Sequence, residues 1–119
     1  MKKVLIVDDS IAVARQLEKI INSAQEFEVI GQGRNGAEAI KLCQQLQPDI
    51  LCMDMNMPLM DGMTALRSLR QLFPELKVIM VTSLGGVGDK YTEALKLGAR
   101  DVISKPFATE AVLKMLKQL

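Results

Sequence analysis

The sequence contains no histidine, and this absence excludes several common kinds of chemistry. Histidine is the most frequent general base and a frequent transition-metal ligand, and serine and cysteine nucleophiles commonly depend on it. Catalysis by a Ser–His or Cys–His pair is therefore excluded. Acid–base or metal chemistry in this chain must rely on carboxylates.

Cysteine is also scarce, with Cys43 and Cys52 as its two occurrences. Both lie inside apolar stretches, and their spacing is not that of a CxxC motif. This pattern predicts two buried free thiols rather than a disulfide or a zinc site.

Long apolar runs and an excess of charge of one sign are missing as well. No run approaches the roughly 20 residues of a membrane-spanning helix, and the amino-terminal segment lacks the features of a signal peptide. Fifteen Lys and Arg residues face 14 Asp and Glu residues, so bulk charge attracts neither nucleic acid nor an anionic membrane. We expect a cytoplasmic protein without a direct nucleic-acid or membrane partner.

Short apolar runs alternate with stretches of helical periodicity along the 119 residues. The runs predicted as strands are Val4–Val7, Phe27–Gly31, Ile50–Met53, Val78–Val81 and Val102–Ile103. Apolar residues spaced by three and four positions predict a helix after each strand. This alternation, with short connections, predicts a doubly wound α/β domain over residues 1–119, with a five-stranded parallel sheet flanked by five helices.

Polar residues stand at the ends of four of the predicted strands. Asp8 and Asp9 follow the first strand, Asp54 the third, Thr82 the fourth and Lys105 the fifth. Each alone has an ordinary structural explanation, such as a helix cap or a solvated charge. The carboxyl ends of parallel strands lie at one edge of a sheet, however, so together these residues predict a common site.

Three crowded carboxylates call for positive charge nearby. Two like charges about 4 Å apart repel by roughly 4 kcal/mol at an effective dielectric near 20. Mg²⁺ is a suitable partner because it prefers oxygen ligands and often takes one or two carboxylates together with a phosphate oxygen. The remaining positive charge would come from Lys105.

Four motifs resemble those of response-regulator receiver domains, the phosphoacceptor modules of two-component signalling. They are VLIVDDS, PDILCMDMNMPLMDG, VIMVTS and SKPF, and in this order they span almost the whole chain. The resemblance is to chemotaxis-type receivers more than to transcriptional ones. It implies a flavodoxin-like sheet with strand order 2-1-3-4-5 and a cis peptide between Lys105 and Pro106.

The resemblance also implies a role for each site residue. Asp54 is the expected phosphoacceptor, and Thr82 and Lys105 are expected to contact the phosphoryl group. The expected ion is Mg²⁺, with Mn²⁺ as an alternative, bound by Asp9, Asp54 and the backbone carbonyl of Asn56, and by Asp8 through water. The phosphoryl donor would be a histidine kinase, a histidine phosphotransfer protein or a small acyl phosphate.

The same likeness implies that phosphorylation switches the surface around the fourth helix and fifth strand toward a downstream protein or a fused output domain. The domain would be a switch rather than an enzyme. Leu84, two positions after Thr82, suggests slow loss of the phosphoryl group. It cannot orient a hydrolytic water.

Three other functions were weighed against this interpretation. A receiver-like interaction domain that works without phosphorylation usually lacks an acidic residue or the lysine, and this chain keeps all of them. A flavodoxin-like cofactor binder disagrees with Asp8 and Asp9, which would repel a phosphate. An aspartate-nucleophile phosphatase would carry a DxD pair after the first strand, where this sequence reads DDSIA.

Overall fold

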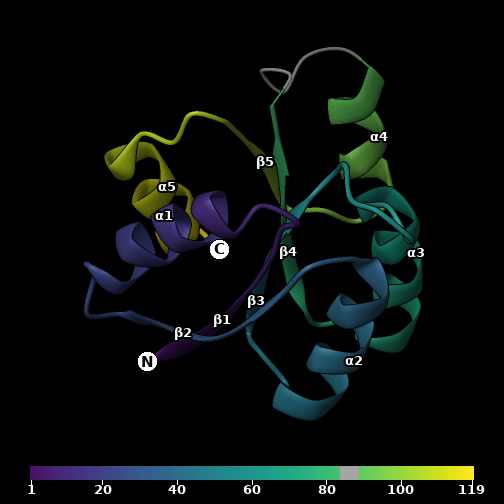
Figure 1. Cartoon of the computed structure of the whole chain (residues 1–119), viewed down its shortest axis with the longest axis horizontal. Helices are drawn as coiled ribbons and strands as arrows, with labels where there is room; N and C mark the ends of the chain where they lie inside the picture. The colour runs from purple at the N-terminus through teal and green to yellow at the C-terminus, as the bar shows by residue number, and fades with distance from the viewer. Residues whose placement is uncertain (84–88) are drawn as a thin grey trace.

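The computed structural model describes residues 1–83 and 89–119, apart from the side chain of Asp89. It forms one five-stranded parallel sheet in the order β2-β1-β3-β4-β5, which confirms the predicted fold and strand order (Figure 1). The strands are β1 (Lys2–Val7), β2 (Phe27–Gly33), β3 (Ile50–Asp54), β4 (Lys77–Thr82) and β5 (Asp101–Ser104). The helices are α1 (Ile11–Asn22), α2 (Gly36–Leu46), α3 (Gly62–Leu72), α4 (Asp89–Lys96) and α5 (Thr109–Lys117).

The sheet has two buried faces because successive side chains of a strand point in opposite directions. In β1, Leu5 and Val7 join the core beneath α2, α3 and α4, whereas Val4 and Ile6 join the core beneath α1 and α5. Figure 1 shows α1 and α5 on one side of the sheet and the other three helices on the opposite side. Because both faces of the sheet are buried, the buried part of each strand must be apolar without interruption, as the sequence predicted.

Three helices begin at side-chain caps. Ser10 Oγ accepts a hydrogen bond of 3.3 Å from the Val13 amide at the start of α1, so Ser10 rather than Asp9 is its cap. Asn35 caps α2 and Asp61 caps α3 in the same way. Since Ser10 provides the α1 cap, Asp9 is available for another role.

The two thiols behave as the sequence predicted. Cys43 and Cys52 are free and buried. Burial raises the pKa of Cys43 to about 11 and that of Cys52 to about 12, so both thiols are protonated near neutral pH.

In the described part of the chain, every helix is too short or too polar to cross a membrane.

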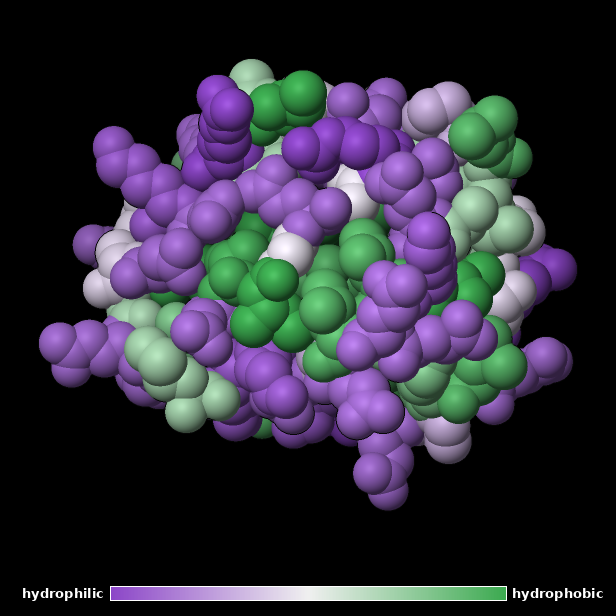
Figure 2. All heavy atoms as spheres, turned by 60° about the horizontal axis from the view of Figure 1, so that its bottom comes forward, coloured by the Kyte–Doolittle hydropathy of each residue, from purple (hydrophilic) through white to green (hydrophobic). Residues whose placement is uncertain are grey.

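The amino ends of the strands border an open hollow of about 650 Å³. Leu72, Phe73 and Leu76 form one wall of it, and Cys43 and Ile50 contribute further apolar lining. Apolar side chains gather in the middle of the face shown in Figure 2, with polar side chains around them. This hollow lies at the edge of the sheet opposite to the strand ends that carry Asp8 and Asp54.

Candidate functional site

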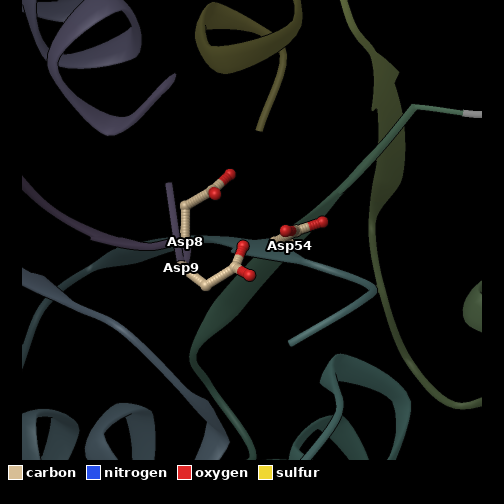
Figure 3. A group of neighbouring side chains, drawn as sticks. All are labelled: Asp8, Asp9 and Asp54. Carbon is tan, nitrogen blue, oxygen red and sulfur yellow. The ribbon is translucent and has the colours of Figure 1, made fainter. Parts of the chain in front are cut away.

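Three carboxylates meet at the carboxyl edge of the sheet. Asp8 follows β1, Asp9 comes next in the chain, and Asp54 is the last residue of β3. One oxygen from each lies within 4.8 Å of the others, and Figure 3 shows the three side chains grouped together. Asp8 and Asp54 are only 2% and 4% exposed, whereas Asp9 is exposed.

This meeting point follows from the strand order. From β1 the chain crosses to β2 on one side, and the next strand, β3, pairs with β1 on the other side. Crossovers that leave in opposite directions open a crevice outside the carboxyl ends of β1 and β3. Asp8 and Asp54 lie at this switch point.

Lys105 supplies the positive charge that the sequence predicted. Its Nζ lies 3.2 Å from an Asp8 oxygen and 3.6 Å from an Asp54 oxygen. The Lys105 amide donates a 2.8 Å hydrogen bond to the Thr82 carbonyl, which joins the residue to the end of β4. The Lys105–Pro106 peptide is cis, as the resemblance implied.

Asp54 holds a proton more tightly than an ordinary aspartate. Burial, repulsion from Asp8 and a smaller repulsion from Asp9 raise its pKa from 3.8 to about 6. The hydrogen bond from the Asn56 amide and the charge of Lys105 favour the ionised form and oppose this rise. The positive charge of Lys105 is therefore too small to offset burial and the repulsion among the three carboxylates.

Backbone amides hold two of the acids in position. Asp8 Oδ1 accepts a 2.9 Å hydrogen bond from the Ser10 amide, and the Asp8 amide donates to the Gly33 carbonyl. Asp54 Oδ1 accepts a 3.3 Å hydrogen bond from the Asn56 amide. The carboxylates are thus oriented by the loops that follow their strands.

Gly62 is a supporting residue whose contact the sequence did not predict. Its amide donates to the Met55 carbonyl at 3.0 Å, bringing the start of α3 against the end of β3. A Cβ at this position would overlap the backbone oxygen of Asp54 and lie 2.9 Å from the Met55 Cα. A glycine directly after the α3 cap was the available signal.

Thr82 ends β4 at the same edge and is 2% exposed. It lies opposite Ser104 in the β4–β5 register, and its carbonyl receives the Lys105 amide. Leu84, on which the expectation of slow dephosphorylation rests, lies outside the described residues. The fold thus groups Asp8, Asp9, Asp54 and Lys105, with Asn56 bonded to Asp54 and Thr82 joined to Lys105.

The donor set suits a hard divalent cation. The three carboxylates offer only oxygen ligands, and two of them are nearly shielded from solvent. Mg²⁺ favours such ligands, whereas sites for softer metals usually contain nitrogen or sulfur. Burial and repulsion from the neighbouring acids raise the pKa of Asp54, and a nearby cation would relieve the repulsion.

Comparisons with known proteins agree with this geometry. Residues 4–117 match the family described as the response regulator receiver domain. The chain is 39% identical over 118 residues to the chemotaxis protein CheY of Listeria monocytogenes, covering 99% of this chain and 98% of that protein. It is also 39% identical to a protein-glutamate methylesterase/protein-glutamine glutaminase of Methanococcoides burtonii, but spans only 34% of that protein's length.

Solved structures show the same likeness. The response regulator domain of Thermotoga maritima CheB superimposes with a TM-score of 0.87 at 35% identity, covering 98% of this chain and 95% of that one. CheY in a CheX-CheY-BeF3-Mg complex from Borrelia burgdorferi gives a TM-score of 0.90 at 34% identity, with coverages of 98% and 87%. The fold, the acidic edge and these similarities lead to one conclusion: the chain belongs to the response regulator receiver domain family.

Proposed function

We propose that residues 1–119 form a receiver domain that accepts a phosphoryl group on Asp54 and works as a signalling switch. The observation that carries this proposal is the convergence of Asp8, Asp9 and Asp54, with Lys105 3.2 and 3.6 Å from two of them. Because Lys105 contacts both Asp54 and Asp8, and Asp9 lies close to them, a reacting phosphoryl group beside Asp54 would meet positive charge as well as metal ligands.

The proposed metal ligands are Asp9, Asp54 and the backbone carbonyl of Asn56, with Asp8 acting through a water molecule. Mg²⁺ is the proposed ion, and Mn²⁺ the alternative. When bound, the ion would screen negative charge between the acids and the phosphoryl oxygens. The exposed Asp9 can adjust to an incoming ion more readily than the buried acids, which are held by backbone hydrogen bonds.

In the proposed transfer, a carboxylate oxygen of Asp54 forms a bond to phosphorus. The bond between phosphorus and the donor's imidazole nitrogen breaks, and the nitrogen keeps the electron pair. Lys105 moves its charge from the carboxylates toward the phosphoryl oxygens, while the Thr82 hydroxyl donates to one of them. Such preorganised positive and donor groups stabilise the charge that develops in the transition state.

A phosphohistidine donor must lie outside residues 1–119, because these contain no histidine. A histidine kinase or a histidine phosphotransfer protein fits this requirement. The surface around α4 and β5 would then bind a downstream protein or a fused output domain. By analogy with the CheX-CheY complex, a chemotaxis protein is a suitable partner class. Methylesterase activity is not proposed, because the chain covers only about a third of those relatives.

The decisive experiment is phosphorylation by acetyl phosphate, followed by phosphate-affinity electrophoresis or intact mass. We expect one phosphoryl group per chain, formed only with Mg²⁺ or Mn²⁺ and abolished in Asp54→Asn. Asp49→Asn, an exposed acid at the opposite end of β3, serves as the matched control and should be phosphorylated normally. A folded wild-type chain that stays unmodified, and also binds no fluoroberyllate, would favour the phosphorylation-independent interaction domain instead.

A further inference from the structure

In the described part of the chain, the carboxyl-terminal end of helix α4 carries several hydrogen bonds. Of its side chains that the structure describes, Ala94 alone is buried. The Gly98 amide donates to the Leu95 carbonyl at 3.1 Å, and the Ala99 amide donates to the Ala94 carbonyl at 3.0 Å. With Gly98 at a φ of 109°, these two bonds form the Schellman arrangement that ends many helices.

Arg70, on the neighbouring helix α3, is bonded directly to this helix end. Its Nη1 donates to the Gly98 carbonyl at 3.4 Å. Its Nη2 donates to the Phe73 carbonyl at 2.9 Å and also to the Leu76 carbonyl. A single planar guanidinium therefore joins the α3–β4 turn to the α4–β5 turn, which the single ammonium of a lysine reproduces poorly.

The shapes of Arg70 and Gly98 also fit each other. A Cβ on Gly98 would overlap the Arg70 Cδ and lie 2.8 Å from its Cγ. Two residues farther on, the Arg100 amide donates to the Val78 carbonyl at 2.8 Å, fixing the turn to β4. The carboxyl end of α4 is thus held by a side chain, by the sheet and by its own capping bonds.

The amino end of α4 is the end that follows the acidic edge of the sheet in the chain. In the chain it follows β4, whose last residue is Thr82. The amino end is thus the end nearer to Thr82 along the chain, whereas the carboxyl end is bonded to α3 through Arg70. An element tied at one end and displaced at the other rotates about the tied end, as in hinge motions.

We propose that Arg70 is a positioning residue: its contact with Gly98 fixes the carboxyl end of α4 as the pivot about which the helix moves when Asp54 is phosphorylated. The movement rests on the proposed function, whereas the fixed end belongs to the unmodified protein. The two parts are therefore tested separately.

The first test measures amide hydrogen exchange in the unmodified protein. In Arg70→Met, the Gly98 and Ala99 amides should exchange about tenfold faster than in the wild type, relative to the Ile79 amide in the sheet. Arg67→Met changes an exposed arginine on the same helix and should leave both rates within about twofold. If Arg70→Met folds poorly, Arg70→Lys keeps the charge and most of the bulk and should show a smaller acceleration. Unchanged rates in both Arg70 variants would overturn the proposal.

The second test adds Mg²⁺ and fluoroberyllate, a phosphoryl mimic, and follows amide NMR signals. In the wild type the Tyr91 signal should shift, while Gly98 and Ala99 stay within the scatter of remote residues. In Arg70→Met the shifts should extend to Gly98 and Ala99. Equal wild-type shifts at Tyr91 and Gly98 would refute the pivot. A lack of any response at Asn56 would instead contradict the proposed function, and the exchange rates would still decide whether Arg70 fixes the helix end.

Discussion

Replacing Asp54 by asparagine should stabilise the metal-free protein at neutral pH. The folded structure raises the pKa of Asp54 from 3.8 to about 6, so the folded chain binds a proton more tightly than the unfolded chain between these values. Stability contributed by this group is therefore fully present below pH 4 and is lost as the pH rises toward 6. The full loss is about 3 kcal/mol, at 1.36 kcal/mol per pH unit. Asparagine cannot ionise and avoids this loss.

This value is already a net one, because the attraction to Lys105 and the hydrogen bond from the Asn56 amide lower the pKa of Asp54 and are included in the shift. We therefore expect Asp54→Asn to be up to about 3 kcal/mol more stable than the wild type at pH 7.5. Below pH 4 the gain should disappear. Added Mg²⁺ should stabilise the wild type selectively and narrow the difference, because the ion binds the folded state.

Urea unfolding, followed by far-ultraviolet circular dichroism in the presence of EDTA, measures this difference from pH 3.5 to 8. Asp49→Asn is the control, since its carboxylate is exposed at the far end of β3 and should give no gain at pH 7.5. Two results would refute the reasoning. One is a variant less stable than the wild type at pH 7.5 without metal, and the other is a stability difference that does not change with pH.

Three further predictions concern the same domain. Lys105→Met should destabilise the metal-free protein at pH 7.5 by about 1–3 kcal/mol, because it leaves buried carboxylates uncompensated; it should also slow phosphorylation by acetyl phosphate, and a variant as stable and reactive as the wild type would be inconsistent with the ion pairs. Gly62→Ala should cost about 1–3 kcal/mol in urea unfolding, since its Cβ overlaps the Asp54 carbonyl; an unchanged midpoint would show that α3 shifts freely. Cys43 and Cys52 should react with a thiol reagent at pH 8 only after denaturant is added, and rapid labelling of the native protein would contradict their burial.

The sheet could be predicted from the sequence because parallel strands that are buried on both faces consist of continuous runs of apolar residues. Its strand limits were too short for a physical reason. β1, β4 and β5 begin at Lys2, Lys77 and Asp101, whose polar side chains broke the apolar pattern. Backbone hydrogen bonding in a ladder does not depend on side-chain polarity, so these residues pair with their neighbours in register. A polar side chain shows where the buried part of a strand ends, but the backbone pairing of that strand can continue beyond it.

The residues of the site could be predicted from the sequence, but the contacts between them could not. Strand ends placed Asp8, Asp54 and Lys105 at one edge, but they did not show which acid the lysine would approach more closely. The structure places its Nζ closer to Asp8, because β1 and β3 are adjacent and the lysine reaches both. The contact between Arg70 and Gly98 joins residues 28 positions apart and follows no local periodicity. Such contacts emerge only when the helices are packed.

Charge balance explains why this edge of the sheet is suited to switching. With Asp8, Asp9 and Asp54 ionised, Lys105 leaves two formal negative charges in a group of three acids, two of which are shielded from water. A divalent cation would neutralise that excess, and phosphorylation of Asp54 would then add negative charge again. In the proposed function, the Thr82 hydroxyl at the end of β4 would donate a hydrogen bond to this added charge. In the proposed switch, the repulsion between crowded carboxylates in the resting domain would let a single phosphoryl group change the contacts of Thr82 at the end of β4.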